Sequence, residues 1–528
     1  MKILVCFKAL PDPDKIIAKD WENFSLETDI LYAGSDLNCF DQSALEIGLK
    51  IKEQEAVRGV EATCTALTVS DKVSSLISCN LYSVGYDEVL YLPLKQSEFQ
   101  PEKISEILYS YAKDKGFDVV ITGSEAGMAE TGMVPYLLAE KLKYPIVTGV
   151  EETKVSDELI VANCRNDEGL IEKTLSTPIV LNIGNSPEIL RMPTLKKRMA
   201  FMGKKATEIE NAFEDESINP NLKRPKTGRT CSMLEVDEEY LDVSKNVLQN
   251  IKNALSEAGN KEENNLGPSN EISKALVESA LFVDPRIKYI GGYEIIADEY
   301  NKISPKITVF PDTEIGRGLA IQLAERQGMK CLFNVEFEKV DKTFVSVKRR
   351  VYSANLEWRQ DIDFPAVFTV VAEEAKKLSD AKRFVLEESN AVPDYIKNEK
   401  LLEKNEENAL SSANVVFVCG AGLKSKDACE KVRKLANSLG AAVGFTRVAA
   451  LNAWGNATEI IGQSGTIIAP KCVIALGTAG AGAFLVGIEK ADKIIAINTD
   501  KSAIIFKNAD IGINMDAETL VDKLLELR

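Results

Sequence analysis

Glycines and polar residues near the end of the chain are of the types that bind a dinucleotide. Gly480 and Gly482 follow one continuous apolar run, Asn498 ends the next, and Asp510 precedes a third. Such runs predict strands buried on both faces of a parallel sheet, which binds ligands outside the carboxyl ends of its strands. The glycines let the backbone approach a pyrophosphate, whose charge suits the N-terminus of the next helix. Asp510 can accept hydrogen bonds from ribose hydroxyls, so the pattern predicts a dinucleotide site, although Gly-rich loops alone are a weak signal.

The composition excludes several other chemistries. The 528 residues contain no histidine, which rules out a histidine base, a Ser-His-Asp triad and a histidine-containing zinc site. The ten cysteines have no CxxC spacing and are expected to be reduced, mostly buried thiols of a cytoplasmic protein. The net charge of −16 argues against binding to nucleic acid or to an anionic membrane surface, and no apolar run is long enough for membrane insertion. The chemistry is therefore expected to come from an organic cofactor.

The chain alternates between expected strands and helices. In the N-terminal part, strands are predicted at 2–10, 62–70 and 117–124, and helices at 38–54, 104–116 and 132–142. Residues 158–184 predict a hairpin followed by a buried strand. The β-α-β alternation predicts a parallel, doubly wound sheet, and the length allows about three domains. The predicted fold class is thus α/β, with three doubly wound parallel-sheet domains.

Six short words carry a resemblance to a known family. They are CGAGLKS (419–425), GFTR (444–447), GQSG (462–465), AGAGAF (479–484), INTD (497–500) and ADIG (509–512). In this order they resemble the Rossmann-like FAD-binding domain of the electron transfer flavoprotein alpha subunit. The resemblance implies that FAD is held by Thr446, Arg447, Ile461, Gln463, Ser464, Gly465, Ala479, Gly480, Ala481, Gly482, Phe484, Asn498, Asp510 and Ile511.

Some positions keep the family's residue chemistry and others depart from it. Arg447 matches the arginine that lies over the flavin ring, and the Ser464 hydroxyl replaces a threonine hydroxyl that reaches flavin N5. The family's usual arginine, serine, glutamine and histidine are here Ala421, Ala479, Ala483 and Phe484. The missing histidine normally donates toward flavin O2, and a charge-assisted bond of that kind contributes about 1.5–3 kcal/mol. Its loss predicts a lower flavin potential, and the four changes together put FAD retention in question.

The N-terminal part resembles the beta subunit of the same family. The matching words are FKALPD (7–12), NCFDQSALE (38–46) and the stretch 123–142, so the chain is expected to be a beta–alpha fusion. In the family these loops hold a second nucleotide, which is AMP in plain carriers and a second FAD in electron-bifurcating members. The implied contacts are Ala9, Asn38, Asp71, Gly123, Ala126, Gly127, Met128, Ala129, Glu130, Thr131, Gly132, Met133 and Val134. The altered word at 127–131 leaves the choice between AMP and FAD open and favours a non-bifurcating carrier.

Residues 193–205 resemble the loop through which the family contacts its partner dehydrogenase. Leu195 matches the leucine that enters an apolar pocket of the partner, and Lys196, Lys197 and Arg198 would form a charged rim. On spacing alone, an ordinary solvated basic loop is the better explanation.

The expected domains follow from these matches and from the composition of the joints. They are a beta-like domain with a C-terminal arm (1–260), a trimmed alpha-N-terminal-like domain (261–400) and the FAD-binding domain (401–528). An amphipathic helix at 238–255 is expected to close the first domain. The stretches 256–272 and 395–414 have linker composition.

The resemblance implies a carrier that moves electrons between a partner flavin dehydrogenase, of the acyl-CoA dehydrogenase type, and a downstream acceptor protein. Two alternatives stay open. One is a redox-inactive nucleotide-binding scaffold, and the other is a bifurcating form with a second FAD that uses NADH and ferredoxin.

Overall fold

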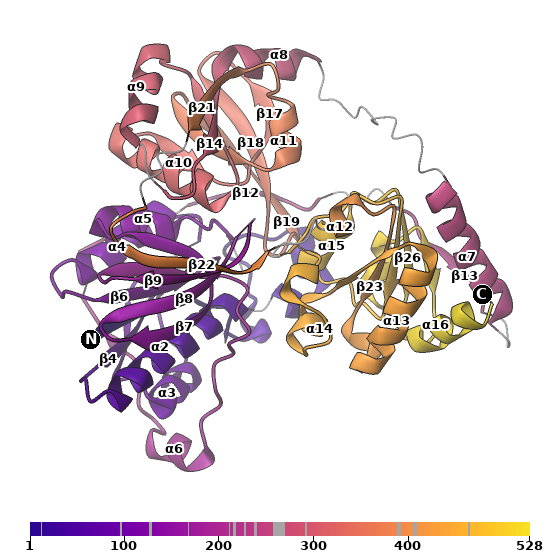
Figure 1. Ribbon diagram of the computed structural model, residues 1–528, viewed down its shortest axis with the longest axis horizontal. Coiled ribbons are helices and arrows are strands. Elements are labelled where there is room, and N and C mark those ends of the chain that lie inside the picture. Colours follow the sequence, from indigo (N-terminus) through magenta and orange to yellow (C-terminus); the bar gives the residue numbers. More distant parts are fainter. Residues whose placement is uncertain are drawn as a thin grey trace. The chain divides into compact units, whose positions relative to one another are not determined.

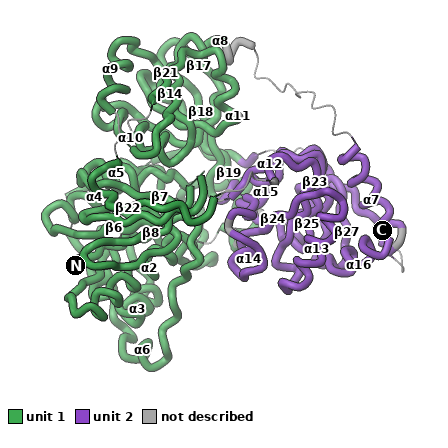
Figure 2. Tube along the Cα trace, viewed as in Figure 1, with its two compact units in different colours: residues 1–223, 267–352, 356–404 green, residues 224–266, 353–355, 405–528 purple. Residues whose placement is uncertain are grey.

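In a computed structural model, the chain separates into two compact units (Figures 1 and 2). The first unit comprises residues 1–223, 267–352 and 356–404, and the second comprises 224–266, 353–355 and 405–528. The structure describes residues 1–528 except 12, 96–97, 126–128, 167, 211, 215–217, 226–228, 237–239, 257–269, 291–292, 388–391, 405–408, 463–464 and 528.

The N-terminal part of the first unit is a ten-stranded sheet with helices on both faces. Its elements are β1 (Lys2–Cys6), α2 (Cys39–Val57), β4 (Thr63–Val69), α3 (Ser75–Val84), β5 (Glu88–Leu92), α4 (Pro101–Ala112), β6 (Val119–Gly123), α5 (Val134–Leu142), β7 (Ile146–Ser156), β8 (Leu159–Arg165), β9 (Gly169–Leu175), β10 (Ile179–Ile183), β11 (Thr207–Glu208) and β22 (Ile396–Lys404). The strand order is β11-β5-β4-β1-β6-β10-β7-β8-β9-β22. Helices α2 and α3 pack on one face, and α4 and α5 on the other (Figure 1).

Strand β1 is the point at which the chain changes direction across this sheet. It pairs in parallel with β4 on one side and with β6 on the other. The chain first builds outward from β1 through β4 to β5, then crosses back through α4 to β6. Ligands of open parallel sheets bind at such a switch point, outside the carboxyl ends of the strands.

The second sheet of this unit repeats part of the first. Its elements are α8 (Asn270–Ser279), β14 (Ala280–Arg286), α9 (Tyr293–Ile303), β15 (Ile307–Pro311), α10 (Glu314–Gln327), β16 (Lys330–Leu332), β17 (Glu336–Val340), β18 (Phe344–Val351), β19 (Leu356–Asp363), β20 (Ala366–Val370), α11 (Ala372–Lys376) and β21 (Lys382–Glu387). The parallel order is β16-β20-β15-β14-β21, and β17–β19 form an antiparallel sheet with β12 (Asn221–Lys223). In the first sheet, the chain runs from β7 through β8 and β9 and then inserts β10 between β6 and β7. In the second, it runs from β16 through β17, β18 and β19 and then inserts β20 between β15 and β16.

Two strands pair with sheets that are formed by distant parts of the sequence. Strand β12, which follows the first sheet, pairs with β19, and β22, which follows the second, pairs with β9. The expectation that 395–414 is wholly a linker is therefore wrong, because 396–404 form an edge strand. The charged composition that suggested a linker also suits an edge strand, whose outer side faces water.

The second unit is built on a six-stranded parallel sheet. Its elements are β13 (Ser232–Leu234), α7 (Leu241–Ser256), α12 (Ala409–Ser412), β23 (Val415–Cys419), α13 (Lys426–Leu439), β24 (Ala442–Phe445), α14 (Arg447–Leu451), β25 (Cys472–Leu476), α15 (Gly482–Ile488), β26 (Lys493–Ile497), β27 (Ile511–Ile513) and α16 (Ala517–Glu526). The order is β13-β27-β26-β25-β23-β24. The three apolar runs near the end of the chain are β25, β26 and β27, and most of their residues are buried, as the runs predict.

Helix α7 packs on the second unit, not on the N-terminal sheet. Val243, Val247 and Ile251 lie on one stripe at helical spacing and join the core beneath β23 and β25. The amphipathic pattern predicted the helix correctly, but not the partner of its apolar face.

The fold confirms the predicted class, an α/β chain with three helix-flanked sheets that are mainly parallel. Among the residues that the structure describes, no helix has both the length and the apolar character needed to cross a membrane.

Candidate functional site

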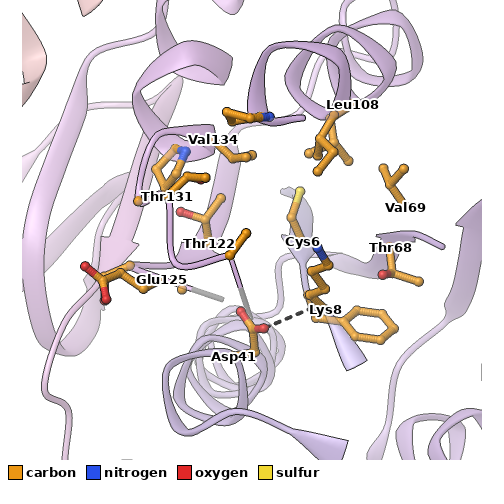
Figure 3. Close-up of a pocket in the computed structure, with 18 of the residues that line it drawn as sticks. Cys6, Lys8, Asp41, Thr68, Val69, Leu108, Thr122, Glu125, Thr131 and Val134 are labelled. Atoms are coloured by element: carbon orange, nitrogen blue, oxygen red, sulfur yellow. Dashed lines mark hydrogen bonds between the residues drawn. The ribbon is translucent and has the colours of Figure 1, made fainter. Parts of the chain in front are cut away.

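The first unit has a pocket at the switch point of its ten-stranded sheet (Figure 3). Its floor is formed by the carboxyl ends of β1, β4 and β6, and its sides by α4 and by residues 123–125, 129–132 and 134–135. The cavity volume is about 100 Å³. Apolar side chains from β4 and α4 line one end, and polar groups gather at the other, so the pocket suits a ligand with one apolar and one polar part.

A buried carboxylate, Asp41, lies at the polar end, at the start of α2. It accepts hydrogen bonds from the Lys8 amide (3.0 Å) and from Asn38 Nδ2 (3.1 Å), and Asn38 also caps α2 by accepting from the Asp41 amide (2.8 Å). A side chain at Gly123 would place its Cβ 2.5 Å from Asp41 Oδ1, so this approach requires glycine. Burial raises the pKa of Asp41 to about 7, against the lowering effects of the Lys8 amide and charge.

Three further polar groups line the pocket, and the sequence did not single them out. The Thr68 and Thr122 side chains are 2% and 4% exposed, and their hydroxyls have no hydrogen-bond partner among the described residues. The Lys8 ammonium forms no ion pair in the described part of the chain, and burial lowers its pKa. Unsatisfied buried donors are costly, so a polar ligand at this point would stabilise them. All three groups lie at or just after the carboxyl end of a strand. Because ligands bind there, these groups can be predicted once the strand ends are known.

The structure brings together most of the residues expected to hold the second nucleotide. Those on the pocket wall are Gly123, Ala129, Glu130, Thr131, Gly132 and Val134, and Asn38 donates to the Glu125 carbonyl beside them (3.0 Å). Ala126, Gly127 and Met128 lie outside the described residues. Ala9, Asp71 and Met133 are not on the wall: Ala9 is in β2 (Ala9–Leu10), Asp71 is exposed, and Met133 is buried in the core against α10. Cys6, the last residue of β1, lines the pocket where Ala9 was expected.

Two arginines from α10 and β18, largely or fully buried, reach the wall segment. Arg317 of α10 forms an ion pair with Asp312 (2.9 Å) and lies 3.7 Å from Glu125. Arg349 of β18 donates to the carbonyl oxygens of Ala129 (2.7 Å) and Glu130 (3.4 Å). The wall of the pocket is therefore fixed from behind by side chains that follow it by about 200 residues.

In the second unit, several of the residues expected to hold FAD gather at the carboxyl edge of the sheet. Thr446 follows β24 and donates its amide to the Cys419 carbonyl (3.0 Å). Ile461 and Gly465 lie in the loop beside it, bonded to Phe445 and Gly462. Asn498 follows β26, and its Nδ2 donates to the Thr478 carbonyl (2.8 Å). Ala479, Gly480, Ala481 and Gly482 follow β25 between these two groups, and Arg447 begins α14. Gln463 and Ser464 lie outside the described residues.

The backbone at this edge is closely packed and leaves one buried hydroxyl without a partner. Gly480 has a φ of +88°, and a Cβ there would collide with the Ile505 amide. The Thr478 hydroxyl, whose side chain is 1% exposed, has no hydrogen-bond partner among the described residues. Val448 and Leu451 of α14 expose apolar side chains at the same edge. An orphaned polar atom beside exposed apolar groups fits a cofactor with a polar chain and an apolar ring.

Three of the residues expected to hold FAD are either at the opposite edge of the sheet or buried. Asp510 and Ile511 are at the amino end of β27, where Asp510 accepts from the Ile494 amide (2.7 Å) and pairs with Arg229. Phe484 is buried in the core beneath α15. Asp516, which the sequence did not single out, is at the carboxyl end of β27 and caps α16. Asp510 precedes the third apolar run and Ile511 begins it, so both lie at the amino end of β27, whereas ligands of a parallel sheet bind outside the carboxyl ends.

The expected partner loop is a short helix with an apolar surface. In α6 (Leu195–Ala200), the Leu195 side chain is 74% exposed, and Met192, Met199 and Met202 near it are also exposed. Lys196, Lys197 and Arg198 belong to the same helix. An exposed apolar cluster with a basic rim is typical of a protein-binding surface.

Two stretches of the chain match models of known protein families. Residues 31–212 match the electron transfer flavoprotein domain, and residues 409–489 match the electron transfer flavoprotein FAD-binding domain. These two stretches are thus similar to electron transfer flavoprotein domains. The second match covers the strands β23 to β25 and the loops at their carboxyl ends, so these loops lie in the stretch that is similar to a FAD-binding domain.

Individual electron transfer flavoproteins are similar over parts of the chain. The probable alpha subunit of Schizosaccharomyces pombe is 45% identical over 23% of this chain and 36% of its own length. The alpha subunit of Bacillus subtilis is 28% identical over 62% of this chain and 97% of its own length. The LctC subunit of lactate dehydrogenase (NAD(+),ferredoxin) from Acetobacterium woodii is 26% identical over 49% of this chain and 65% of its own length. The chain spans between about a third and a half of the length of several such relatives.

Proposed function

We propose that this chain is a single-chain electron carrier in which FAD, held at the carboxyl edge of the second unit, takes electrons from a partner flavin dehydrogenase and passes them to an acceptor protein. The observation that carries this proposal is the coincidence of the FAD-binding-domain match at 409–489 with the loops that hold the unpartnered Thr478 hydroxyl. When bound, FAD supplies the redox chemistry. The residues of the chain bind and orient it and exclude water from it.

The proposal includes a beta–alpha order within the chain. Residues 1–260 would correspond to a beta subunit with its arm, 261–400 to a trimmed first alpha domain and 401–528 to the FAD-binding domain. The two related sheets of the first unit support this order, because a fusion of two subunits that each carry this domain would contain it twice. A cytoplasmic location is in keeping with ten cysteines that are all free and mostly buried.

The pocket of the first unit would hold a second nucleotide, and AMP is the better candidate. The changed residues of the motif at 127–131 favour a non-bifurcating carrier, and with it AMP over a second FAD. The similarity to LctC, a subunit of an enzyme named for both NAD(+) and ferredoxin, favours the bifurcating form as the second candidate.

The exposed surface at Leu195 would receive the dehydrogenase, for which an acyl-CoA dehydrogenase is the first candidate to test. Its apolar centre and basic rim suit a partner with an apolar pocket and acidic surroundings.

Denaturing release and chromatography of the bound nucleotides test the proposal. We expect one FAD per chain and one AMP per chain. Two FAD and no AMP would favour the bifurcating form. A folded, colourless protein that takes up no added FAD, and whose melting temperature still rises with AMP, would refute the carrier and leave a nucleotide-binding scaffold.

A further inference from the structure

The exposed surface around Leu195 is rich in methionine. The chain has nine methionines, and among those that the structure describes, four have exposed side chains. Three of these four lie within residues 192–202: Met192 and Met202 are 80% exposed, and Met199 is 65% exposed. The fourth, Met233, belongs to the second unit. Leucine would make a purely apolar contact as well as methionine does, so the sulfur atoms distinguish this surface.

The methionines lie along the same stripe as Leu195. Leu195 and Met199 are four residues apart in α6 and therefore share one face of the helix. Met202 continues that face one turn further, just past the end of α6, and Met192 lies three residues before its start. A partner that buries the Leu195 side chain would therefore bury these thioethers as well.

Helix α6 is attached to α3 by groups other than these sulfur atoms (Figure 1). The Cys79 thiol of α3 donates to the Arg198 carbonyl oxygen (3.6 Å). The Phe201 ring stacks on the Tyr82 ring with 6.2 Å between centroids, and the Lys204 ammonium lies 3.7 Å from the centroid of the same Tyr82 ring. A chemical change at the exposed methionines would thus leave the helix in place and alter only the surface that it presents.

Exposed thioethers are the methionine groups that a hydroperoxide can reach. In the forward step, the O–O bond breaks and its terminal oxygen forms an S–O bond; the sulfur loses two electrons, and the peroxide is reduced to an alcohol or to water. In the reverse step, a dithiol reductase supplies two electrons and two protons, becomes a disulfide, and releases the oxygen as water. Met133 and Met515 are 1% and 6% exposed, so their thioethers are shielded from this chemistry.

A sulfoxide in the stripe would oppose docking. Water hydrates its oxygen in the free chain, but the apolar pocket of a partner excludes that water and offers no donor in exchange. A buried polar group without a partner is costly enough to weaken association about tenfold.

We propose that Met192, Met199 and Met202 form a redox-modification site, and that their oxidation to sulfoxides by a hydroperoxide closes the surface at Leu195 to the partner dehydrogenase until a thiol-dependent reductase restores them. This inference rests on the proposed partner surface and adds its regulation. The modification and the docking can be measured separately, because the first changes the mass of a peptide and the second changes a rate.

The experiment treats the full FAD-loaded chain with dilute hydrogen peroxide, then with dithiothreitol, which reverses cysteine oxidation to sulfenic acid or disulfide, and then desalts it. Peptide mass spectrometry should find sulfoxide at Met192, Met199 and Met202 before Met133 and Met515. In stopped flow with a reduced acyl-CoA dehydrogenase, the half-saturating concentration of dehydrogenase should rise about tenfold, and methionine sulfoxide reductases should reverse the rise. Flavin absorbance per chain and the melting temperature should stay the same.

Three variants identify the methionines responsible. In the triple variant Met192→Leu, Met199→Leu, Met202→Leu, peroxide should leave the half-saturating concentration near that variant's own untreated value. Met233→Leu is the matched control, because it removes an exposed methionine from the second unit, and peroxide should weaken its docking as in wild type. Met199→Gln, which places a polar group in the stripe, should weaken docking without peroxide.

Two kinds of result would count against the inference, and they differ. If the three methionines stay unoxidised, if the triple leucine variant loses docking as wild type does, or if sulfoxides leave docking unchanged while Leu195→Ala weakens it, the modification site is wrong and the partner surface stands. If neither oxidation nor Leu195→Ala changes docking, the partner surface itself is refuted, and the inference with it.

Discussion

Replacing Asp41 by asparagine should remove a pH dependence of stability that we expect to stand out in this chain. The side chain is buried at the start of α2, and burial raises its pKa from an ordinary value of 3.8 to about 7. The chain has no histidine, so ordinary side chains contribute little titration between pH 5 and pH 8.

The sign follows from proton linkage. Between the two pKa values, folded Asp41 holds a proton that the unfolded chain has released, so the free energy of unfolding falls as pH rises and levels off above about pH 7. Each pKa unit corresponds to about 1.4 kcal/mol, which gives on the order of 4 kcal/mol in all and about 2–3 kcal/mol between pH 5 and pH 7. Asparagine resembles the protonated form and cannot ionise, so the variant should lack this fall.

Urea unfolding at pH 5, 6, 7 and 8, followed by tryptophan fluorescence, measures the effect. Two of the three tryptophans, Trp21 and Trp358, are buried in the first unit. The third, Trp454, belongs to the second unit and is replaced by phenylalanine in every protein compared, so the fluorescence reports on the first unit alone. Burial also raises the pKa of Glu151. This residue is present in both wild type and the variant, so the difference between the two proteins isolates Asp41. Asp71→Asn, a change at an exposed aspartate, is the control and should follow wild type.

The stability of Asp41→Asn relative to wild type should increase by about 2–3 kcal/mol from pH 5 to pH 7.5. The loss of one acceptor for the Lys8 amide adds a pH-independent cost of about 1 kcal/mol, which shifts the whole curve without changing its slope. Parallel pH curves for the two proteins would refute the reasoning, because they would mean that the Asp41 carboxyl is ionised throughout this range.

Three other changes test the two sites and the framework. Thr478→Val should leave the flavin-free protein equally or more stable, by up to about 1 kcal/mol, and weaken FAD binding severalfold in fluorescence titration; unchanged FAD affinity would remove this hydroxyl from the site. Leu195→Ala, at a position that is 74% exposed, should leave the melting temperature unchanged and slow electron transfer from an acyl-CoA dehydrogenase at least tenfold in stopped flow, whereas equal rates would count against the partner surface. Arg191→Ala removes three side-chain bonds to the buried Glu46 (2.6, 2.9 and 3.1 Å) and the ion pair with Glu53 (2.5 Å), and should cost about 2 kcal/mol in urea unfolding, partly restored by the double variant with Glu46→Gln; a loss below about 0.5 kcal/mol would contradict the pairing.

The sequence alone determined the fold class and the main elements, and it predicted the approximate positions of both candidate sites. Buried parallel strands are continuous apolar runs and amphipathic helices repeat every three to four residues, so β25, α2 and α5 follow from local pattern. The order of the short motifs predicts the positions of the glycines at 480 and 482 and of the segment 129–134, because loops at strand ends recur at fixed places along an alternating chain.

Tertiary structure alone decided which distant segments complete each sheet and each site. The edge strand β22 and helix α7 pack on sheets far from their sequence neighbours, and no local signal names the partner of an edge strand or of an apolar helix face. Register placed Asp510 at one end of β27 and Asp516 at the other, a difference of one strand length that spacing does not resolve. Arg349 reaches the pocket wall across about 220 residues of sequence, because the charge balance of a buried site depends on everything that packs around it.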